Sequence, residues 1–506
     1  MEINTLPVEV LSHIIGFLPW RAPDNYTGIE VELEDLRNAR LVCRLWNTIA
    51  SVHLFRDVAL LHTDDGKDFS NFKEQTESPM VQDVARCAVV YSGPHHHCLD
   101  MSHDDSRDYD VWEEWDTGVY EEFTEAIDCI TKLPKLKAVH IRFSSRCNGD
   151  PDYDWVYENG IEKFSTRINT IKAVFSAIVE RKAQGNNTPI TSLAIENLQN
   201  MPFPEFVASD LFKSVVKDIT ELRLLVAEEY NEHGPDHDLK CEERRTFEPW
   251  LQTELLPVFA DQLMSLHLAF NENWGVAPGY FDGKGLVFPY LKTLTLCDFV
   301  IGHHDQFDWV LKQTTLETLR LDRCCIVSHL KFHIGNFRFP ENSLEEWSVR
   351  THDWTEHPPW AFGFSESHRT FTFSGKWETL FDDIRSRLPN LADFRNEYAR
   401  YGSDDKFNTT EYLACQLPRL RYITLDTGLL PSPWIQPDEW TGGMSFGNND
   451  PTPLPLDERN NAGWPQPKCK LNRAEETAEG DLRAFSELVA AVEDRRRRSG
   501  LSPVSF

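Results

Sequence analysis

Apolar positions near the beginning of the chain recur with the period of an α-helix. In the stretch LPVEVLSHIIGFLP, aliphatic side chains stand at offsets 0, 4, 5, 8, 9 and 12 from the first leucine, which places them on one side of a helix. These side chains are Leu6, Val10, Leu11, Ile14, Ile15 and Leu18. Pro7 suits a first helical turn and Pro19 ends the helix. The pattern therefore predicts an amphipathic helix of about three turns.

A second helix is predicted after a polar segment, from Glu34 onwards. One of its apolar stripes consists of Leu36, Ala39, Cys43, Trp46 and Ala50, and the other of Leu41, Leu45, Ile49 and Val52. Two stripes on one helix require two covering surfaces, and the first helix supplies only one of them. The other stripe either packs onto the downstream chain or binds a second protein.

Beyond residue 60 the phrase L-x-x-L-x-L recurs, with Ile, Val or an aromatic residue at some positions. Its copies begin at Leu136, Ile190, Ile219, Leu263, Leu291, Leu316, Leu344, Leu391 and Leu420. Five of the eight intervals are 25 to 29 residues long, which is close to the period of leucine-rich repeats. The last two apolar side chains of each copy point to one face of a strand. Helical patterns lie between several copies, so we expect an α/β fold, an irregular leucine-rich-repeat solenoid with a parallel sheet.

The N-terminal helices carry a specific combination of motifs. Leu6-Pro7 and Leu18-Pro19 bracket the first helix, and the run Arg40-Leu41-Val42-Cys43-Arg44 with Trp46 follows. In these features residues 4–60 resemble the F-box, although the connection between the two helices is longer than usual. The resemblance implies an all-α domain that docks a Skp-type adaptor, which in turn bridges to a cullin–RING ubiquitin ligase. The residues it assigns to the adaptor-binding surface and its support are Leu6, Pro7, Val10, Ile14, Leu18, Leu36, Leu41, Val42 and Trp46.

An F-box followed by leucine-rich repeats is a combination familiar from fungal F-box proteins. It implies a substrate-recognition subunit of an SCF-type ubiquitin ligase, a non-catalytic role without cofactors. The outward-facing strand residues are candidates for binding a protein substrate: His140, Arg142, Arg223, His267, Thr295, Arg320, Asp322, Ser348 and Arg350. The alternative is an F-box scaffold that acts outside ubiquitin transfer. The sequence contains no P-loop or zinc-protease motif.

Composition and charge restrict the class of partner. The 506 residues are 41% hydrophobic and 26% charged, and the formal net charge is -30. An acidic surface repels nucleic acid and anionic membranes, so protein partners, including basic ones, are favoured. The sequence has no run of 18 apolar residues and no secretion signal, and its 11 cysteines are expected to be reduced thiols. We therefore expect a cytoplasmic or nuclear protein, without a metal site.

Three domains are predicted from these patterns: the F-box domain at 1–60, the repeat domain at 61–430, and a proline-rich strap with a C-terminal amphipathic helix at 431–506. Residues 100–122 form an acidic, aromatic insertion, which is either a solvated loop or an arm that grips a basic segment. The C-terminal helix, with apolar positions at Leu482, Phe485 and Leu488, either caps the repeats or is a loose appendage.

Overall fold

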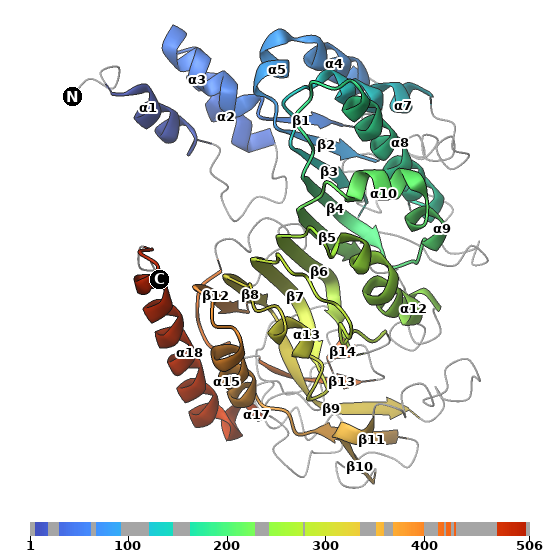
Figure 1. The fold of residues 1–506 in the computed structure, drawn as a ribbon, viewed down its shortest axis with the longest axis vertical. Coiled ribbons are helices and arrows are strands. Elements are labelled where there is room, and N and C mark those ends of the chain that lie inside the picture. The colour runs from blue at the N-terminus through green and yellow to red at the C-terminus, as the bar shows by residue number, and fades with distance from the viewer. Residues whose placement is uncertain are drawn as a thin grey trace, which may run out of the picture. The chain divides into compact units, whose positions relative to one another are not determined.

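The computed structural model describes residues 6–18, 30–61, 67–92, 121–144, 162–227, 242–276, 279–333, 351–358, 368–398, 413–418, 421–426, 430–431 and 473–501. These residues form a mixed α/β fold (Figure 1). The chain divides into two compact units, one comprising Met1–Leu198, Ala208–Leu224 and Gly402–Asp404, the other Gln199–Val207, Leu225–Tyr401 and Asp405–Phe506. Among the helices described, none has the length and apolar character needed to cross a membrane.

The first unit begins with three helices, α1 (Val8–Ile15), α2 (Glu30–Ala39) and α3 (Arg44–Leu54). Its strands are β1 (Asp57–Leu60), β2 (Cys87–Tyr91), β3 (Ala138–Arg142), β4 (Ser192–Gln199) and the beginning of β5 (Glu221–Ala227). Between the strands lie α4 (Lys67–Glu77), α5 (Pro79–Val84), α7 (Glu121–Asp128), a 3₁₀ helix (Cys129–Lys132), α8 (Phe164–Ala183) and α10 (Asp210–Val216). The strands β1 to β4 pair in chain order and are parallel. The helices α4, α7, α8 and α10 also pack in chain order (Figure 1).

Each leucine phrase of the first unit becomes a strand in the same way. The strands β3, β4 and β5 begin two residues after Leu136, Ile190 and Ile219, the first apolar residues of their phrases. The three apolar positions of each phrase are buried, as in Leu136, Val139 and Ile141. Because alternate strand residues face opposite sides, the intervening side chains lie on the other face of the sheet.

One backbone carbonyl per repeat accepts two hydrogen bonds from the next repeat. The carbonyl of Arg56 accepts from the N–H groups of Arg86 and Cys87 at 2.7 and 3.2 Å. The carbonyls of Arg86, Lys137 and Thr191 accept two N–H groups in the same way, and so do those of Met264, Lys292 and Glu317 in the second unit. The repeated sequence phrase therefore corresponds to a repeated pattern of backbone hydrogen bonds where the strands begin.

The second unit contains a parallel strand series and an antiparallel part. Its strands are β6 (Ser265–Trp274), β7 (Thr293–Ile301), β8 (Thr318–Asp322), β9 (Cys325–His333), β10 (Trp354–His357), β11 (His368–Phe373), β12 (Asp393–Glu397), β13 (Tyr422–Asp426) and β14 (Leu430–Pro431). The strands β6, β7, β8 and β12 pair in parallel. In contrast, β11 pairs antiparallel with both β9 and β10, and β14 with β13. The expected parallel sheet is thus mostly, not entirely, parallel.

The helices of the second unit include the C-terminal one. They are α9 (Pro204–Val207), α12 (Glu242–Trp250), a π-helix (Leu251–Leu255), a 3₁₀ helix (Leu256–Phe259), α13 (Asp308–Leu311), a 3₁₀ turn (Thr351–Asp353), α15 (Trp377–Arg387), α17 (Arg473–Glu476) and α18 (Ala478–Arg498). The helix α18 packs along α15 and against β12 (Figure 1). The carboxylate of Asp481 accepts a hydrogen bond from Arg421 Nε at 2.8 Å. The C-terminal helix is therefore an integral part of this unit, not a loose appendage.

The predicted second helix is in fact two helices. The helix α2 ends at Ala39, and Cys43 has an extended backbone (φ -164°, ψ 173°) before α3 begins at Arg44. Neither predicted stripe therefore lies on one helix, because the break interrupts the first stripe between Ala39 and Trp46 and separates Leu41 from the rest of the second. No proline or glycine marks this break, so the apolar periodicity gave no sign of it. The domain boundaries at residues 60 and 430, and the acidic insertion, stay predictions; positions 93–120 and 432–472 lie outside the described residues.

Candidate functional site

The helix α1 carries two apolar stripes with different surroundings. Leu11 and Ile15 are fully buried. Val10 and Ile14, one turn apart, are 44% and 45% exposed, and Phe17 in the following turn is 66% exposed. Val10, Ile14 and Phe17 are called the outer stripe below. Exposed apolar residues that cluster in this way are typical of a protein-binding surface.

The inner side of α1 is covered by the other two N-terminal helices. One buried cluster contains Leu11 and Ile15 of α1, Leu36 and Ala39 of α2, and Ile49 and Ala50 of α3. Ser12 Oγ lies 3.1 Å from His53 Nε2, which joins α1 to α3. The helices also approach closely at Gly16, where an added Cβ would lie 3.0 Å from the His53 ring. The three helices are thus held together without the outer stripe.

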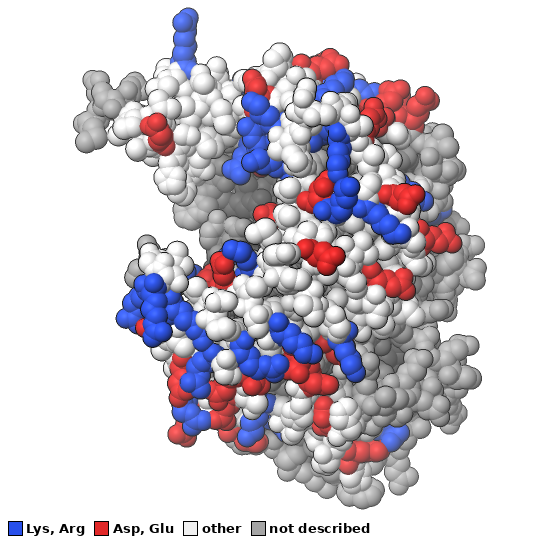
Figure 2. All heavy atoms as spheres, viewed as in Figure 1, with Lys and Arg blue, Asp and Glu red and all other residues white. Residues whose placement is uncertain are grey.

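The turn between α2 and α3 presents two further apolar side chains. Leu41 is 83% exposed and Val42 60%. Arg40 anchors this turn, because its Nε donates to Asn47 Oδ1 at 3.1 Å and its guanidinium lies 5.3 Å from the ring centre of Phe55. On the face seen in Figure 2, the surface formed by α1 to α3 is mainly uncharged. The turn therefore extends the apolar character of the outer stripe to a second exposed segment.

The nine residues assigned to adaptor binding divide into three groups. Pro7, Val10, Ile14, Leu41 and Val42 are exposed; Leu6, Leu18 and Trp46 are half-buried; Leu36 is buried in the internal cluster. Leu36 therefore supports the helices and cannot contact a partner directly. Sequence reasoning missed Phe17, although its three-residue spacing from Ile14 was visible in the sequence.

A network of polar side chains crosses the sheet of the first unit. Tyr91, Arg142 and Glu196 are register neighbours on β2, β3 and β4. Arg142 donates from Nη2 to Glu196 Oε1 at 2.7 Å and from Nη1 to Tyr91 Oη at 2.8 Å. His140 Nε2 lies 2.9 Å from Glu196 Oε2. Burial raises the pKa of Glu196, but the hydrogen bond from His140 and the charge of Arg142 outweigh it and lower the pKa to about 2.

The other predicted substrate residues have varied positions. Arg223 and Arg320 are half-buried, and Arg320 Nη2 lies 3.9 Å from Asp393 Oδ2. His267, Thr295 and Asp322 are buried, because the second unit covers both faces of its central strands, as the burial of eight consecutive residues in β7 shows. Alternation alone therefore placed these three residues on the surface incorrectly. Ser348 and Arg350 lie outside the described residues.

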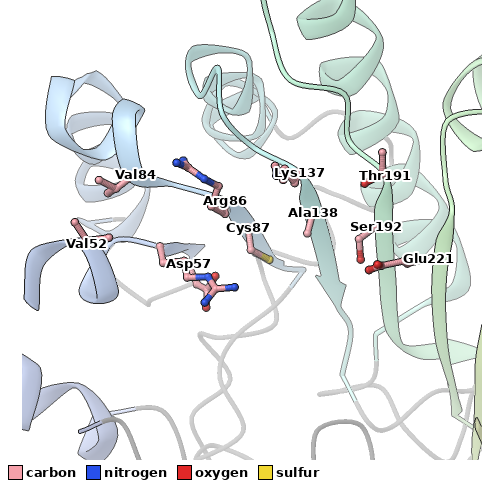
Figure 3. Close-up of a pocket in the computed structure, with 11 residues that line it drawn as sticks. Val52, Asp57, Val84, Arg86, Cys87, Lys137, Ala138, Thr191, Ser192 and Glu221 are labelled. Carbon is pink, nitrogen blue, oxygen red and sulfur yellow. The ribbon is translucent and has the colours of Figure 1, made fainter. Parts of the chain in front are cut away.

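A pocket of about 540 Å³ lies where the strands of the first unit begin. Figure 3 shows its lining residues following one another across successive strands, from Asp57 to Glu221. The basic members are Arg56, Arg86 and Lys137, the acidic ones Asp57 and Glu221, and the remainder are Val52, Val84, Cys87, Ala138, Thr191 and Ser192. The pocket thus combines charged side chains with an apolar part formed by two valines and an alanine.

The thiol in this pocket is not activated for nucleophilic attack. Burial and the nearby Asp57 carboxylate raise the pKa of the Cys87 thiol to about 12, so the thiol stays protonated and is a poor nucleophile. In the part of the chain that the structure describes, no group of three or more His, Cys, Asp or Glu side chains is placed to hold a metal ion.

Comparison with known proteins identifies the N-terminal helices. The sequence model of the F-box-like family matches residues 3–60, the segment that contains α1, α2, α3 and the whole of β1. No curated protein matches the chain. The chain therefore carries an F-box-like domain at its N-terminus, which implies an adaptor role.

Proposed function

We propose that this protein is a substrate-recognition subunit of an SCF-type cullin–RING ubiquitin ligase. The outer stripe, with Leu41 and Val42, docks a Skp-type adaptor that links the chain to a cullin, and the strand repeats hold a protein target. The observation that carries this proposal is the division of α1 into a buried inner stripe and an exposed outer stripe, inside the segment matched by the F-box-like family.

The energetics of the N-terminal helices support a docking role. Burying one large aliphatic or aromatic side chain contributes roughly 1.5–3 kcal/mol. The inner stripe already gains this by packing against α2 and α3, whereas Ile14 and Phe17, which are 45% and 66% exposed, gain the remaining part only when a partner covers them. In this role the protein performs no bond chemistry. It raises the effective concentration of target lysines near a ubiquitin that is activated elsewhere.

The test is a titration of the purified chain with a purified Skp-type adaptor. The double variant I14D/F17D should bind at least about a hundredfold more weakly, because two apolar contacts worth roughly 1.5–3 kcal/mol each are replaced by buried charges. The matched control is V287D in the second unit, where Val287 is exposed to a similar extent as Ile14. This control should bind the adaptor like the unaltered chain.

A pull-down of the chain from cells separates the proposal from its alternative. If the adaptor binds and a cullin is recovered with it from cells, the ligase role is supported. Recovery of the adaptor without a cullin would favour a scaffold outside ubiquitin transfer. Unchanged adaptor affinity of I14D/F17D would refute the assignment of the outer stripe.

A further inference from the structure

The basic residues of the pocket occupy one repeated position. Arg56, Arg86 and Lys137 each directly precede the first residue of a strand, and it is their carbonyls that accept the paired hydrogen bonds described above. Neighbouring strands lie about 4.8 Å apart. The repeat therefore aligns three cationic residues in a row along the edge of the sheet. This row is called the cationic row below.

The cationic row lacks a matching row of anions. Among the residues that the structure describes, none of the three takes part in an ion pair, and Arg86 Nη1 donates to the backbone carbonyls of Asp83 and Ala85. Like charges at directly neighbouring strand positions are destabilising. Figure 2 shows Lys and Arg side chains gathered beside the beginning of β1. Although the net charge of the chain is -30, the charged side chains that line this pocket are three basic and two acidic ones.

We propose that the pocket binds a short acidic segment of a protein in an extended conformation. The anionic side chains of the segment lie along the cationic row, and an apolar side chain between them contacts Val52 and Val84. A volume of about 540 Å³ is within the range of ligand pockets and holds a few side chains. The inference rests on the proposed function only in identifying the bound segment as part of a ligase target; the binding itself does not depend on it.

The acidic side chain of Glu221, at the far end of the pocket, predicts whether a substitution strengthens or weakens binding of an acidic segment. Glu221 is exposed and lies beyond Ser192 in the order of strands (Figure 3). A carboxylate here repels an anionic ligand that extends past the cationic row. Removing the charge of Glu221 should therefore strengthen binding, whereas a purely structural role of these side chains gives no reason for an increase.

The experiment measures fluorescence anisotropy of labelled peptides with the purified full chain. The probe is a peptide of alternating Glu and Val, compared with versions in which Gln, Lys or phosphoserine replaces Glu. We expect the Glu or the phosphoserine peptide, or both, to bind, with the Gln version weaker and the Lys version not bound. Preference for phosphoserine over Glu assigns the negative charge to a phosphorylated segment. Equal binding of the Lys version would overturn the inference.

Variants of the pocket complete the test. The triple variant R56Q/R86Q/K137Q should weaken binding about tenfold, because three charge contacts, two of them exposed and that of Arg86 half-buried, contribute a few tenths to 1 kcal/mol each. The double variant R56Q/K137Q changes only exposed side chains; it should fold like the unaltered chain and still bind the peptide more weakly. E221Q should strengthen binding about twofold or more.

The matched control removes three exposed lysines elsewhere, K213Q/K217Q/K284Q, and should leave peptide binding within twofold. Equal weakening by this control and by the pocket triple would overturn the inference. The pocket variants should still bind the Skp-type adaptor. If the unaltered chain binds the adaptor but binds the Glu and Lys peptides equally, only the pocket proposal is refuted. If it discriminates between these peptides but does not bind the adaptor, only the adaptor role is refuted.

Discussion

Replacing Asp481 by Asn tests how the C-terminal helix is held in the second unit. The Asp481 side chain is fully buried. Its carboxylate accepts hydrogen bonds from Arg421 Nε at 2.8 Å, from Thr477 Oγ1 at 2.6 Å and from Tyr422 Oη at 3.1 Å. It also accepts one from the backbone N–H of Glu378, the second residue of α15, at 2.9 Å. A single carboxylate thus connects α18 to α15 and to the segment that leads into β13.

The magnitude follows from the burial of the Arg421–Asp481 ion pair, whose side chains are 6% and 0% exposed. Asn keeps the shape of Asp but leaves the Arg421 guanidinium buried without its counter-charge. Removing one partner of a buried ion pair destabilises a protein by about 3–5 kcal/mol. Local opening of α18 should therefore become at least about a hundredfold more frequent, because each 1.4 kcal/mol is a factor of ten.

Hydrogen–deuterium exchange of the peptides covering residues 478–498 measures this opening directly. The control is D382N, which breaks the exposed Asp382–Arg385 pair on α15 and should change exchange by less than about threefold. The double variant R421M/D481L removes both charges and should recover only part of the protection, because Thr477, Tyr422 and the Glu378 N–H lose their acceptor. Exchange of α18 in D481N at the rate of the unaltered chain would refute the reasoning.

Three further predictions concern individual buried groups. Burial raises the pKa of Glu248 to about 8, and only one hydrogen bond, from the Gly275 N–H, opposes this shift. Folding therefore favours the neutral carboxyl group, and stability is lost as the pH rises from about 4.5 to 8. E248Q should raise the unfolding midpoint at pH 8 but not at pH 4. The lowered pKa of Glu196 has the opposite sign, so its contribution is lost as the pH falls from about 4.5 to 2, and acid titration of E196Q should lack this loss. L11A should destabilise the N-terminal helices by about 2–5 kcal/mol, as measured by faster amide exchange in α1, whereas I14A should leave exchange unchanged and weaken only adaptor binding.

The strands were the part of the fold that the sequence predicted best. In every described leucine phrase, including those beginning at Leu316 and Leu391, a strand starts two residues after the first residue of the phrase. The phrase predicts a strand because its three positions are all buried, although in the copy from Leu391 the third position is Asn396. The strands β1 and β2 have the same arrangement but escaped detection. In β2 the buried positions are Ala85, Ala88 and Val90, and alanines do not stand out in a search for leucines.

The limits of sequence reasoning had a different physical cause at each site. Periodicity showed which residues of α1 are apolar, but only packing against α2 and α3 separates Leu11 from Ile14. Alternation showed that His267 faces away from the leucine side, but it could not show that the other face is covered as well. The pocket was missed because it is formed by the residues just before the strands, such as Arg86, whose alignment depends on the register between distant segments.

The net charge of the chain and the charge of the cationic row favour partners of opposite charge. The net charge of -30 favoured basic partners, whereas the cationic row favours an acidic one. These influences act over different distances, because salt at physiological strength screens exposed charges beyond about 8 Å. Within the pocket a ligand is close to Arg56 and Lys137, which line it together with the acidic Asp57 and Glu221. The acidic surface then improves selectivity, because an acidic segment that misses the cationic row is repelled and only one that fits the pocket is retained.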